Sequence, residues 1–323
     1  MAEMNDVFAV ARIRAKEKSL LTDADINQMV AMKDQAAILS FLRDKGWGDE
    51  ADGDNVDAML LKEETKALAL MKELGLDKDV LDVLEYPNLY HNLKAGIKEI
   101  CTEGQHPQAF YESASIGRDA MLRILRDKDY NKLPDHMRKP AIHAYETMVQ
   151  TMDGQMCDVI ADRACLDAME KVAVSSKHAI MKDYMTSTVA VTNIRIAVRA
   201  ARTGKSINFL KAALAPCKSF NVNRLAQAAS EGLDPLYSFL TDAHFGEAVD
   251  ALKVSDSAFE RWCDNRLIES IRPQRRNPFT LGPVVAYYLA RLNEIKTARI
   301  ILTAKANDLP EDDIRERMRD MYV

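Results

Sequence analysis

Apolar and polar residues follow a helical period along most of this chain. The pattern is clearest in NEIKTARIILTAKANDLPEDDIRERMRDMYV, residues 293–323. Apolar residues recur along it at spacings of three and four, which is typical of one buried helix face. The first part of this stripe starts just before the segment and comprises Leu292, Ile295, Ala298, Leu302 and Ala306. Asn307-Asp308 interrupts the stripe, and Pro310 suits the first turn of a new helix because its missing N–H needs no partner there. We therefore predict a helix, a turn and a second helix.

The second of these helices has a charge order that favours helix formation. Acidic residues open it and basic residues lie toward its end, which complements the helix dipole; they are Glu311, Asp312 and Asp313, then Arg315, Arg317 and Arg319. Ile314, Met318 and Met321 continue the apolar stripe. Because loose termini rarely carry such a pattern, we expect this helix pair to be docked against the rest of the protein.

Other segments also favour helices. Residues 58–75 are strongly periodic and end at Gly75. Thr22 and Asp25 resemble a capping box, with Asp in place of the usual Glu. Residues 186–196 include several β-branched residues, but their continuation has a helical period, so we predict a helix there. No segment shows clean strand alternation bounded by turns. The predicted fold class is all-α.

Three stretches of the chain resemble one another: residues 38–48, 121–131 and 236–246. Each has apolar residues, then Asp, then two residues and an aromatic, which is Trp47, Tyr130 or Phe245. We expect these aromatics to occupy equivalent, at least partly buried places. An internal repeat of this kind determines the architecture of a protein.

A second marker lies on a helix upstream of each stretch, at residues 10–16, 92–98 and 193–199, and residues 297–305 begin a fourth copy. From the first copy to the second, the helix markers are 82 residues apart and the aromatic markers are 83 residues apart. From the second copy to the third, the corresponding separations are 101 and 115 residues, so the third copy matches only if it contains an insertion between the two markers. Chance similarity between amphipathic helices is the alternative, and the matched first spacing argues against it. The sequence predicts three related helical lobes.

Composition narrows the class of protein. The chain has 323 residues with 12 glycines and 10 prolines, fewer of these helix breakers than average, which favours long helices. The net charge of −5 provides no general attraction to nucleic acid or anionic membrane. Five cysteines without a CxxC motif indicate buried thiols in a reducing compartment. Charged residues near the N-terminus, and apolar runs too short to span a bilayer, predict a soluble cytoplasmic protein.

The motif TGKS at 203–206 resembles part of a phosphate-binding loop. The first glycine of such a loop would fall at Arg199, and a strand should precede the loop where we predict a helix. We therefore interpret Gly204 as a plain helix end. The six histidines form no HExxH motif and offer no convergent set of zinc ligands. The sequence predicts no catalytic residue, no cofactor and no metal site.

Two groups of arginines are candidates for partner binding. One lies on a single helix face at spacings of four and three and comprises Arg195, Arg199 and Arg202. The other surrounds Pro273 and comprises Arg272, Arg275 and Arg276. Each group is either a solvated face or a docking surface for an acidic or polar partner, because the planar guanidinium pairs well with carboxylates.

Four segments together resemble a known family: residues 8–22, 90–98, 192–210 and, above all, 293–323. Along essentially its whole length the chain resembles the C subunit of the archaeal and bacterial V/A-type rotary ATPases, a relative of the d subunit of the eukaryotic V-ATPase. The resemblance implies a non-catalytic central-stalk subunit with three pseudo-threefold-related lobes arranged as a funnel. We expect the lobes to cover residues 1–110, 111–208 and 209–323.

The resemblance also implies partners and a place in the cell. Such a funnel receives the foot of the central shaft and sits on the cytoplasmic face of the membrane rotor ring. It passes rotation between them during ATP-linked transport of H⁺ or Na⁺. No nucleic acid, small-molecule substrate or membrane span of its own is expected. The alternative is an unrelated all-helical cytosolic scaffold or adaptor, which the neighbouring genes would distinguish.

Overall fold

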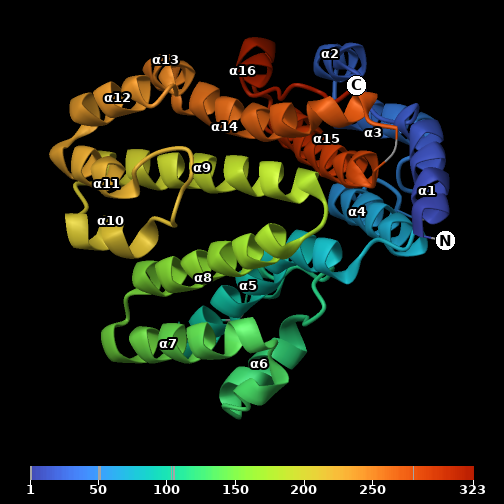
Figure 1. The fold of residues 1–323 in the computed structure, drawn as a ribbon. Coiled ribbons are helices and arrows are strands. Elements are labelled where there is room, and N and C mark those ends of the chain that lie inside the picture. The colour runs from blue at the N-terminus through green and yellow to red at the C-terminus, as the bar shows by residue number, and fades with distance from the viewer. Residues whose placement is uncertain (1, 50–51, 103, 105, 279) are drawn as a thin grey trace. The chain divides into compact units, whose positions relative to one another are not determined.

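The computed structural model describes the chain except residues 1, 50, 51, 103, 105 and 279. It is 77% helical, and none of the residues it describes lies in a strand, so the predicted all-α class is confirmed. Figure 1 labels the helices along the chain. The chain forms two compact units, each built from separate stretches. Unit 1 comprises Met1–Leu76, His178–Ser187 and His244–Val323, and unit 2 comprises Asp77–Lys177 and Thr188–Ala243.

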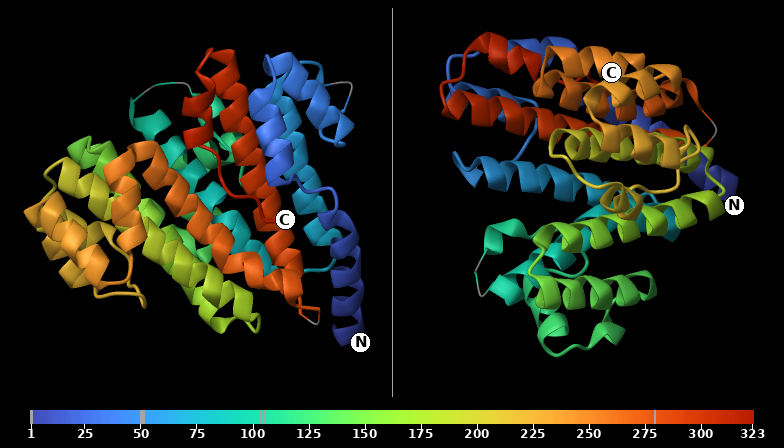
Figure 2. Two further views of the ribbon diagram at one scale, coloured as in Figure 1. Left: turned by 90° about the horizontal axis from the view of Figure 1, so that it is seen from above. Right: turned by 90° about the vertical axis from the view of Figure 1, so that its left-hand side faces the viewer.

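Unit 1 combines helices from both ends of the chain, and the blue and red helices lie together in Figures 1 and 2. Its helices are α1 (Ala2–Glu17), α2 (Asp23–Ala31), α3 (Gln35–Asp44), α4 (Val56–Glu73), α13 (Gly246–Val254), α14 (Asp256–Ile271), η4 (Arg272–Arg276), α15 (Gly282–Ala306) and α16 (Glu311–Glu316). Helix α15 packs against α1 and α4, which brings the late apolar stripe onto the early helices.

The core of unit 1 contains most of the predicted stripe of α15, although Ala306 at its end is exposed. Ile295, Ala298 and Leu302 are buried among side chains of α2, α3 and α4. Ile314 and Met321 belong to the same core, so the expected docking of the C-terminal segment is confirmed. The structure also confirms the predicted signals at the ends of these helices. Thr22 and Asp25 form the capping box of α2, and Gly75 has the left-handed φ of +68° just after α4.

The last seven residues differ from the prediction. Helix α16 ends at Glu316, so Met318 and Met321 do not continue a helix. The terminal segment is instead held by side chains: the Asp320 N–H donates to Asn265 Oδ1 at 3.0 Å, and the Met321 N–H donates to Asp23 Oδ1 at 3.1 Å. Because these side chains satisfy its backbone groups, the segment does not need helical hydrogen bonds.

Unit 2 begins with the helices α5 (Lys78–Thr102), η2 (Pro107–Ala109), α6 (Arg118–Arg126), η3 (Tyr130–Lys132), α7 (Asp135–Thr151) and α8 (Gly154–Ser175). Helix α8 packs against both α5 and α7. Helix α9 (Ala179–Arg202) begins in unit 1 and continues in unit 2, so residues 186–196 are helical as predicted. Unit 2 also contains α10 (Ile207–Ala213), α11 (Val222–Glu231) and α12 (Leu233–Asp242).

The three repeated aromatics share a local structure. Each follows a short helix, α3, α6 or α12, and in each case a residue with positive φ stands two positions after the helix end: Gly46, Lys128 or His244. Trp47 and Phe245 are 2% and 8% exposed, and Tyr130 is half-buried, which agrees with the expected burial. The positive-φ residue precedes Trp47 and Phe245 directly, but it stands one residue earlier before Tyr130.

Three long helices share a second feature besides the repeated aromatics, which is a buried asparagine. Buried asparagines stand about a hundred residues apart in α5, α9 and α15: Asn92, Asn193 and Asn293. Each side-chain amide binds backbone of a later segment of its own unit, at Tyr111, Ala215 and Asp320 respectively. The register of these helices therefore supports related lobes. The three-lobe funnel and its boundaries at 110 and 208 stay predictions.

Candidate partner-binding site

The predicted arginine stripe lies on the part of α9 that belongs to unit 2. Arg195 is half-buried, whereas Arg199 and Arg202 are exposed near the end of the helix. Arg195 and Arg202 each take part in an interaction within the protein. Arg199 forms no ion pair with a carboxylate in the part of the chain that the structure describes. Two of the three cations are therefore already engaged, which weakens the stripe as a docking surface.

The TGKS motif is a helix end, as predicted. Gly204 follows α9 with a φ of +62°. Lys205 Nζ donates to Gln155 Oε1 at 2.6 Å, and Ser206 Oγ accepts the Phe209 N–H at 3.3 Å, which caps α10. The two side chains that would hold a phosphate thus have structural partners.

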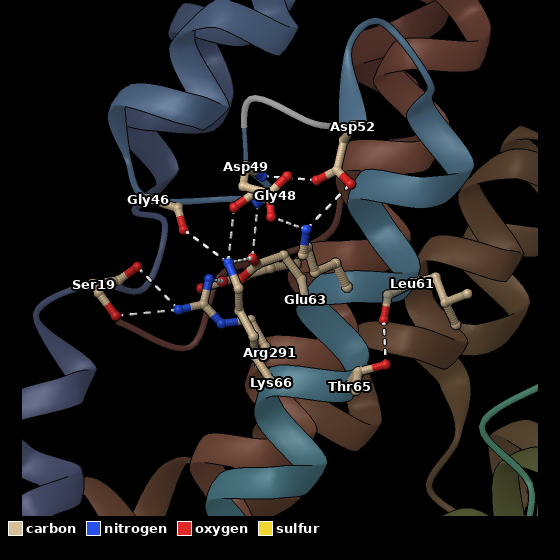
Figure 3. A network of polar contacts seen from close by, with 12 residues as sticks. Ser19, Gly46, Gly48, Asp49, Asp52, Leu61, Glu63, Thr65, Lys66 and Arg291 are labelled. Carbon is tan, nitrogen blue, oxygen red and sulfur yellow. Dashed lines mark hydrogen bonds and ion pairs between the residues drawn. The ribbon is translucent and has the colours of Figure 1, made fainter.

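A buried polar network in unit 1 was not found from the sequence. Its centre is Arg291 of α15, which is only 5% exposed (Figure 3). Arg291 Nη2 donates to the backbone oxygen and to Oγ of Ser19, both at 3.2 Å. The guanidinium also lies over the ring of Trp47, 5.3 Å from its centroid. Arg291 therefore ties α15 to the turn after α1 and to the repeated aromatic that follows α3.

Glu294 lies one helical turn after Arg291 and is 1% exposed. Its Oε1 accepts the Leu21 N–H at 2.7 Å, and its Oε2 is 2.9 Å from Arg291 Nη1. Burial raises the pKa of Glu294 to about 8, against the opposing effects of Arg291 and the Leu21 N–H. The sequence signal that could have identified this pair is two charged residues three positions apart, directly after the uncharged run of residues 281–290.

Glu63 and Lys66 of α4 complete the network around the turn that carries Trp47 (Figure 3). Glu63 Oε1 accepts the Gly48 N–H at 3.0 Å and a bond from Lys66 Nζ at 2.6 Å. Lys66 Nζ also donates to the carbonyls of Gly46 and Gly48, at 3.3 and 3.1 Å. A cavity of about 500 Å³ adjoins this turn, and its cationic lining is Arg12, Lys16, Lys45, Lys66 and Arg291.

Most of these cations already have carboxylate partners. Arg12 pairs with Glu73 at 2.7 Å, Lys45 with Asp25 at 2.7 Å and Lys66 with Glu63. The network is therefore a structural clamp between α1, α3, α4 and α15.

None of the described His, Cys, Asp and Glu side chains forms a group of three or more that could hold a metal ion. Within the described part of the chain, no helix is long and apolar enough to cross a bilayer.

These features define an all-helical protein whose buried polar side chains brace its helices. Residues 9–317 match the family described as "ATP synthase (C/AC39) subunit", and the chain belongs to that family. The family resemblance predicted from the sequence is thereby confirmed.

Individual relatives align along almost the whole chain. The C subunit of the V-type sodium ATPase of Enterococcus hirae is 21% identical over 322 residues, covering 96% of this chain and 97% of that protein. The C subunit of the A-type ATP synthase of Halorubrum lacusprofundi is 22% identical over 348 residues, covering 97% of each chain. The corresponding protein of Halobacterium salinarum is 28% identical over 354 residues, again covering 97% of each.

Proposed function

We propose that this protein is a non-catalytic central-stalk subunit of a V/A-type rotary ATPase. In this role it is the socket that couples the central shaft to the membrane rotor ring during ATP-linked H⁺ or Na⁺ transport. The match to the ATP synthase (C/AC39) subunit family over residues 9–317 is the observation that carries the proposal. Relatives named as C subunits of such ATPases, which align over nearly the full length, support it further.

The internal construction suits a part that transmits torque. Such a part has to resist shear between its helices while its two partners turn with it. Helices α5, α9 and α15 are 24 or 25 residues long, which corresponds to about 37 Å each. Their buried asparagines attach later segments to them by hydrogen bonds, and the Arg291 network braces α15 against α1, α3 and α4. Buried hydrogen bonds whose donor and acceptor are both satisfied, such as those of Asn92 and Asn193, rigidify a core.

The proposed location follows from this role. The protein would sit on the cytoplasmic face of the membrane and contact the ring through the ring's own loops. Stable interfaces of this kind bury roughly 1,200–2,000 Å² in total, and arginine and aromatic anchors contribute most of their binding energy. An interface with the shaft and another with the ring would each need a surface of that size.

The arginine stripe of α9 is one proposed partner-facing surface. Exposed ion pairs contribute only about 0.2–1 kcal/mol each, so a single substitution can have no measurable effect. The test is therefore the combined change of Arg195, Arg199 and Arg202 to Glu, with co-assembly with shaft and ring measured at low and moderate salt. Weaker, less salt-dependent assembly would support the surface. Unchanged assembly would show that the stripe is a solvated or internally paired face.

The role itself is tested by affinity purification of the tagged protein from native membranes. We expect the catalytic, shaft and proteolipid-ring subunits of a rotary ATPase to co-purify in fixed proportion. Deleting the gene should leave a ring without its attached shaft. Recovery of other cytosolic proteins in place of these subunits would favour the alternative, an all-helical scaffold or adaptor.

A further inference from the structure

The second arginine group forms a concave basic surface in unit 1. Arg272–Arg276, with the sequence RPQRR, form the short helix η4 between α14 and α15; we refer to these five residues as the arginine loop. An open concavity of about 770 Å³ lies against it. The lining residues are Glu269, Arg272, Pro273, Arg275 and Arg276. Pockets that hold a bound group in proteins have volumes of about 300–1,000 Å³, so this one is large enough for several side chains.

A side chain of another helix binds the backbone of the arginine loop and of the residue that follows it. Arg14 of α1 donates through Nη2 to the carbonyls of Gln274 and Asn277, at 2.7 and 3.0 Å. The other arm of the same guanidinium is bound by both carboxylate oxygens of Glu17, at 2.7 and 2.8 Å. Asn277 Nδ2 donates to Gln274 Oε1 at 3.0 Å and so closes the loop on itself. The loop is fixed before any partner arrives.

Gly282 shows how closely the loop packs against the start of α15. A Cβ at this position would lie 1.9 Å from Gln274 Oε1, so a larger residue would displace the Gln274 side chain. Arg272 is anchored as well, because its Nη2 donates to the Met321 carbonyl at 3.2 Å and lies 3.6 Å from Asp320 Oδ2. A pre-arranged site loses less conformational entropy on binding than a flexible one, which strengthens binding.

Arg275 and Arg276 differ from most other cations of unit 1. Both are exposed, and neither pairs with a carboxylate in the part of the chain that the structure describes. Glu269 is the one acidic residue among the described lining residues, and it lies 3.4 Å from Arg266. Two guanidinium groups on a rigid, concave support are therefore available to an external ligand. Adjacent guanidinium forks match the paired oxygens of carboxylates.

We propose that the arginine loop is a docking site for an acidic segment of another subunit of the ATPase complex, whose carboxylates pair with Arg275 and Arg276. This inference rests on the proposed function, which supplies a permanent protein partner. Charge complementarity selects the occupant, because the concavity is lined by three arginines and one glutamate. The rigidity of the loop favours a site that fixes the orientation of the partner and resists rotation against it.

The test compares charge reversals in two places on the same unit. Arg275→Glu/Arg276→Glu reverses the loop, and Lys33→Glu/Lys253→Glu reverses two exposed lysines elsewhere on unit 1 with the same change in net charge. Each protein is titrated against the complex stripped of this subunit, at several salt concentrations. We expect the loop variant to bind about tenfold more weakly or worse and with a smaller salt slope. The lysine variant should stay within about twofold of the wild type.

A conservative variant and a reciprocal one make the result specific. Arg275→Lys/Arg276→Lys keeps the charge but not the planar fork, so intermediate binding is expected. Replacing acidic residues of the partner by Lys should restore binding of the loop variant and weaken binding of the wild type. Thermal melts of all variants check that each is folded.

The other outcomes each overturn the inference. Equal losses in the loop variant and the lysine variant would show a general charge effect. Unchanged binding would show that the loop contacts no partner. Binding of the wild type, but not of the loop variant, to phosphatidylglycerol vesicles or to inorganic phosphate, with subunit binding unaffected, would assign the site to another anion. Failure of the wild type to bind the stripped complex would refute the proposed function as well, so the two failures are distinguishable.

Discussion

The side-chain amide of Asn193 forms a two-way hydrogen bond with the backbone of Ala215. Asn193 Nδ2 donates to the Ala215 carbonyl at 2.8 Å, and the Ala215 N–H donates to Asn193 Oδ1 at 2.9 Å. Both residues are buried, at 0% and 1% exposed. Asn92 of α5 makes the same pair of bonds with Tyr111, at 2.9 and 2.8 Å. The same pair of side-chain to backbone hydrogen bonds thus holds a later segment against α9 and another against α5.

Replacing Asn193 by Ala should destabilise unit 2 by about 2–4 kcal/mol, because it leaves a buried N–H and a buried carbonyl without partners. Urea unfolding of the full chain, followed by helical circular dichroism, measures this loss. Asn208→Ala, which removes an exposed asparagine of the following helix, is the matched control and should change the stability by less than about 0.5 kcal/mol. Equal effects of the two changes would contradict the clamp.

Gly96 of α5 should not tolerate a branched side chain. A Cβ at this position would lie 2.9 Å from Leu125 Cδ1 and 3.1 Å from Met121 Cγ, because α6 packs closely against α5 there. We expect Gly96→Val to cost about 1–3 kcal/mol of stability through overpacking. Gly154→Val is the comparison, since only Lys98 Cε lies near its Cβ position, at 3.6 Å. A thermal melt of Gly96→Val that matches the wild type would show that the helices can separate without cost.

Glu294 should make the stability of the protein depend on pH. Its folded-state pKa is about 8, whereas its ordinary value is 4.5. A group with a raised folded-state pKa contributes stability that is fully present below the unfolded pKa. The contribution is lost as the pH rises through the folded pKa. Between about pH 4.5 and 8 the folded state binds more protons than the unfolded state, so this group lowers stability as the pH rises. The charges that act on it are Arg291, Asp25 and Glu63.

We therefore expect Glu294→Gln to flatten the fall in stability over this pH window. Chemical denaturation at intervals from pH 5 to pH 9 measures the difference between variant and wild type. Glu112→Gln, a change at an exposed position of unit 2, serves as the control and should leave the pH profile unchanged. A wild-type profile that rises through this range, and loses its rise in Glu294→Gln, would show that Glu294 is ionised in its pair with Arg291.

The Thr203–Ser206 turn should bind no nucleotide. Lys205 and Ser206 have structural partners, and Arg199 stands where a phosphate-binding loop needs its first glycine. Isothermal titration of the purified chain with Mg-ATP should give no heat of binding, and no ATP should be hydrolysed. Micromolar binding that Lys205→Ala abolishes would contradict this prediction.

Local patterns in the sequence were sufficient for several helices and for some of their ends. The apolar period, the Thr22–Asp25 capping box and the glycines after α4 and α9 depend on residues a few positions apart, and the structure confirms each of them. The burial of Trp47 and Phe245 was also predictable, because the repeated stretches place an aromatic just after a helix end.

Only the tertiary structure determined which polar residues that are distant in sequence form hydrogen bonds with one another. The Leu21 N–H finds its acceptor in Glu294, and Arg14 finds the carbonyls of Gln274 and Asn277, partners more than 250 residues away in sequence. The same long-range contacts explain the terminal segment, whose apolar spacing predicted a helix to Met321. Side chains from distant helices satisfy its backbone, and no local pattern records where those side chains are. Periodicity is a property of neighbouring residues, whereas hydrogen-bond partners depend on how the helices pack.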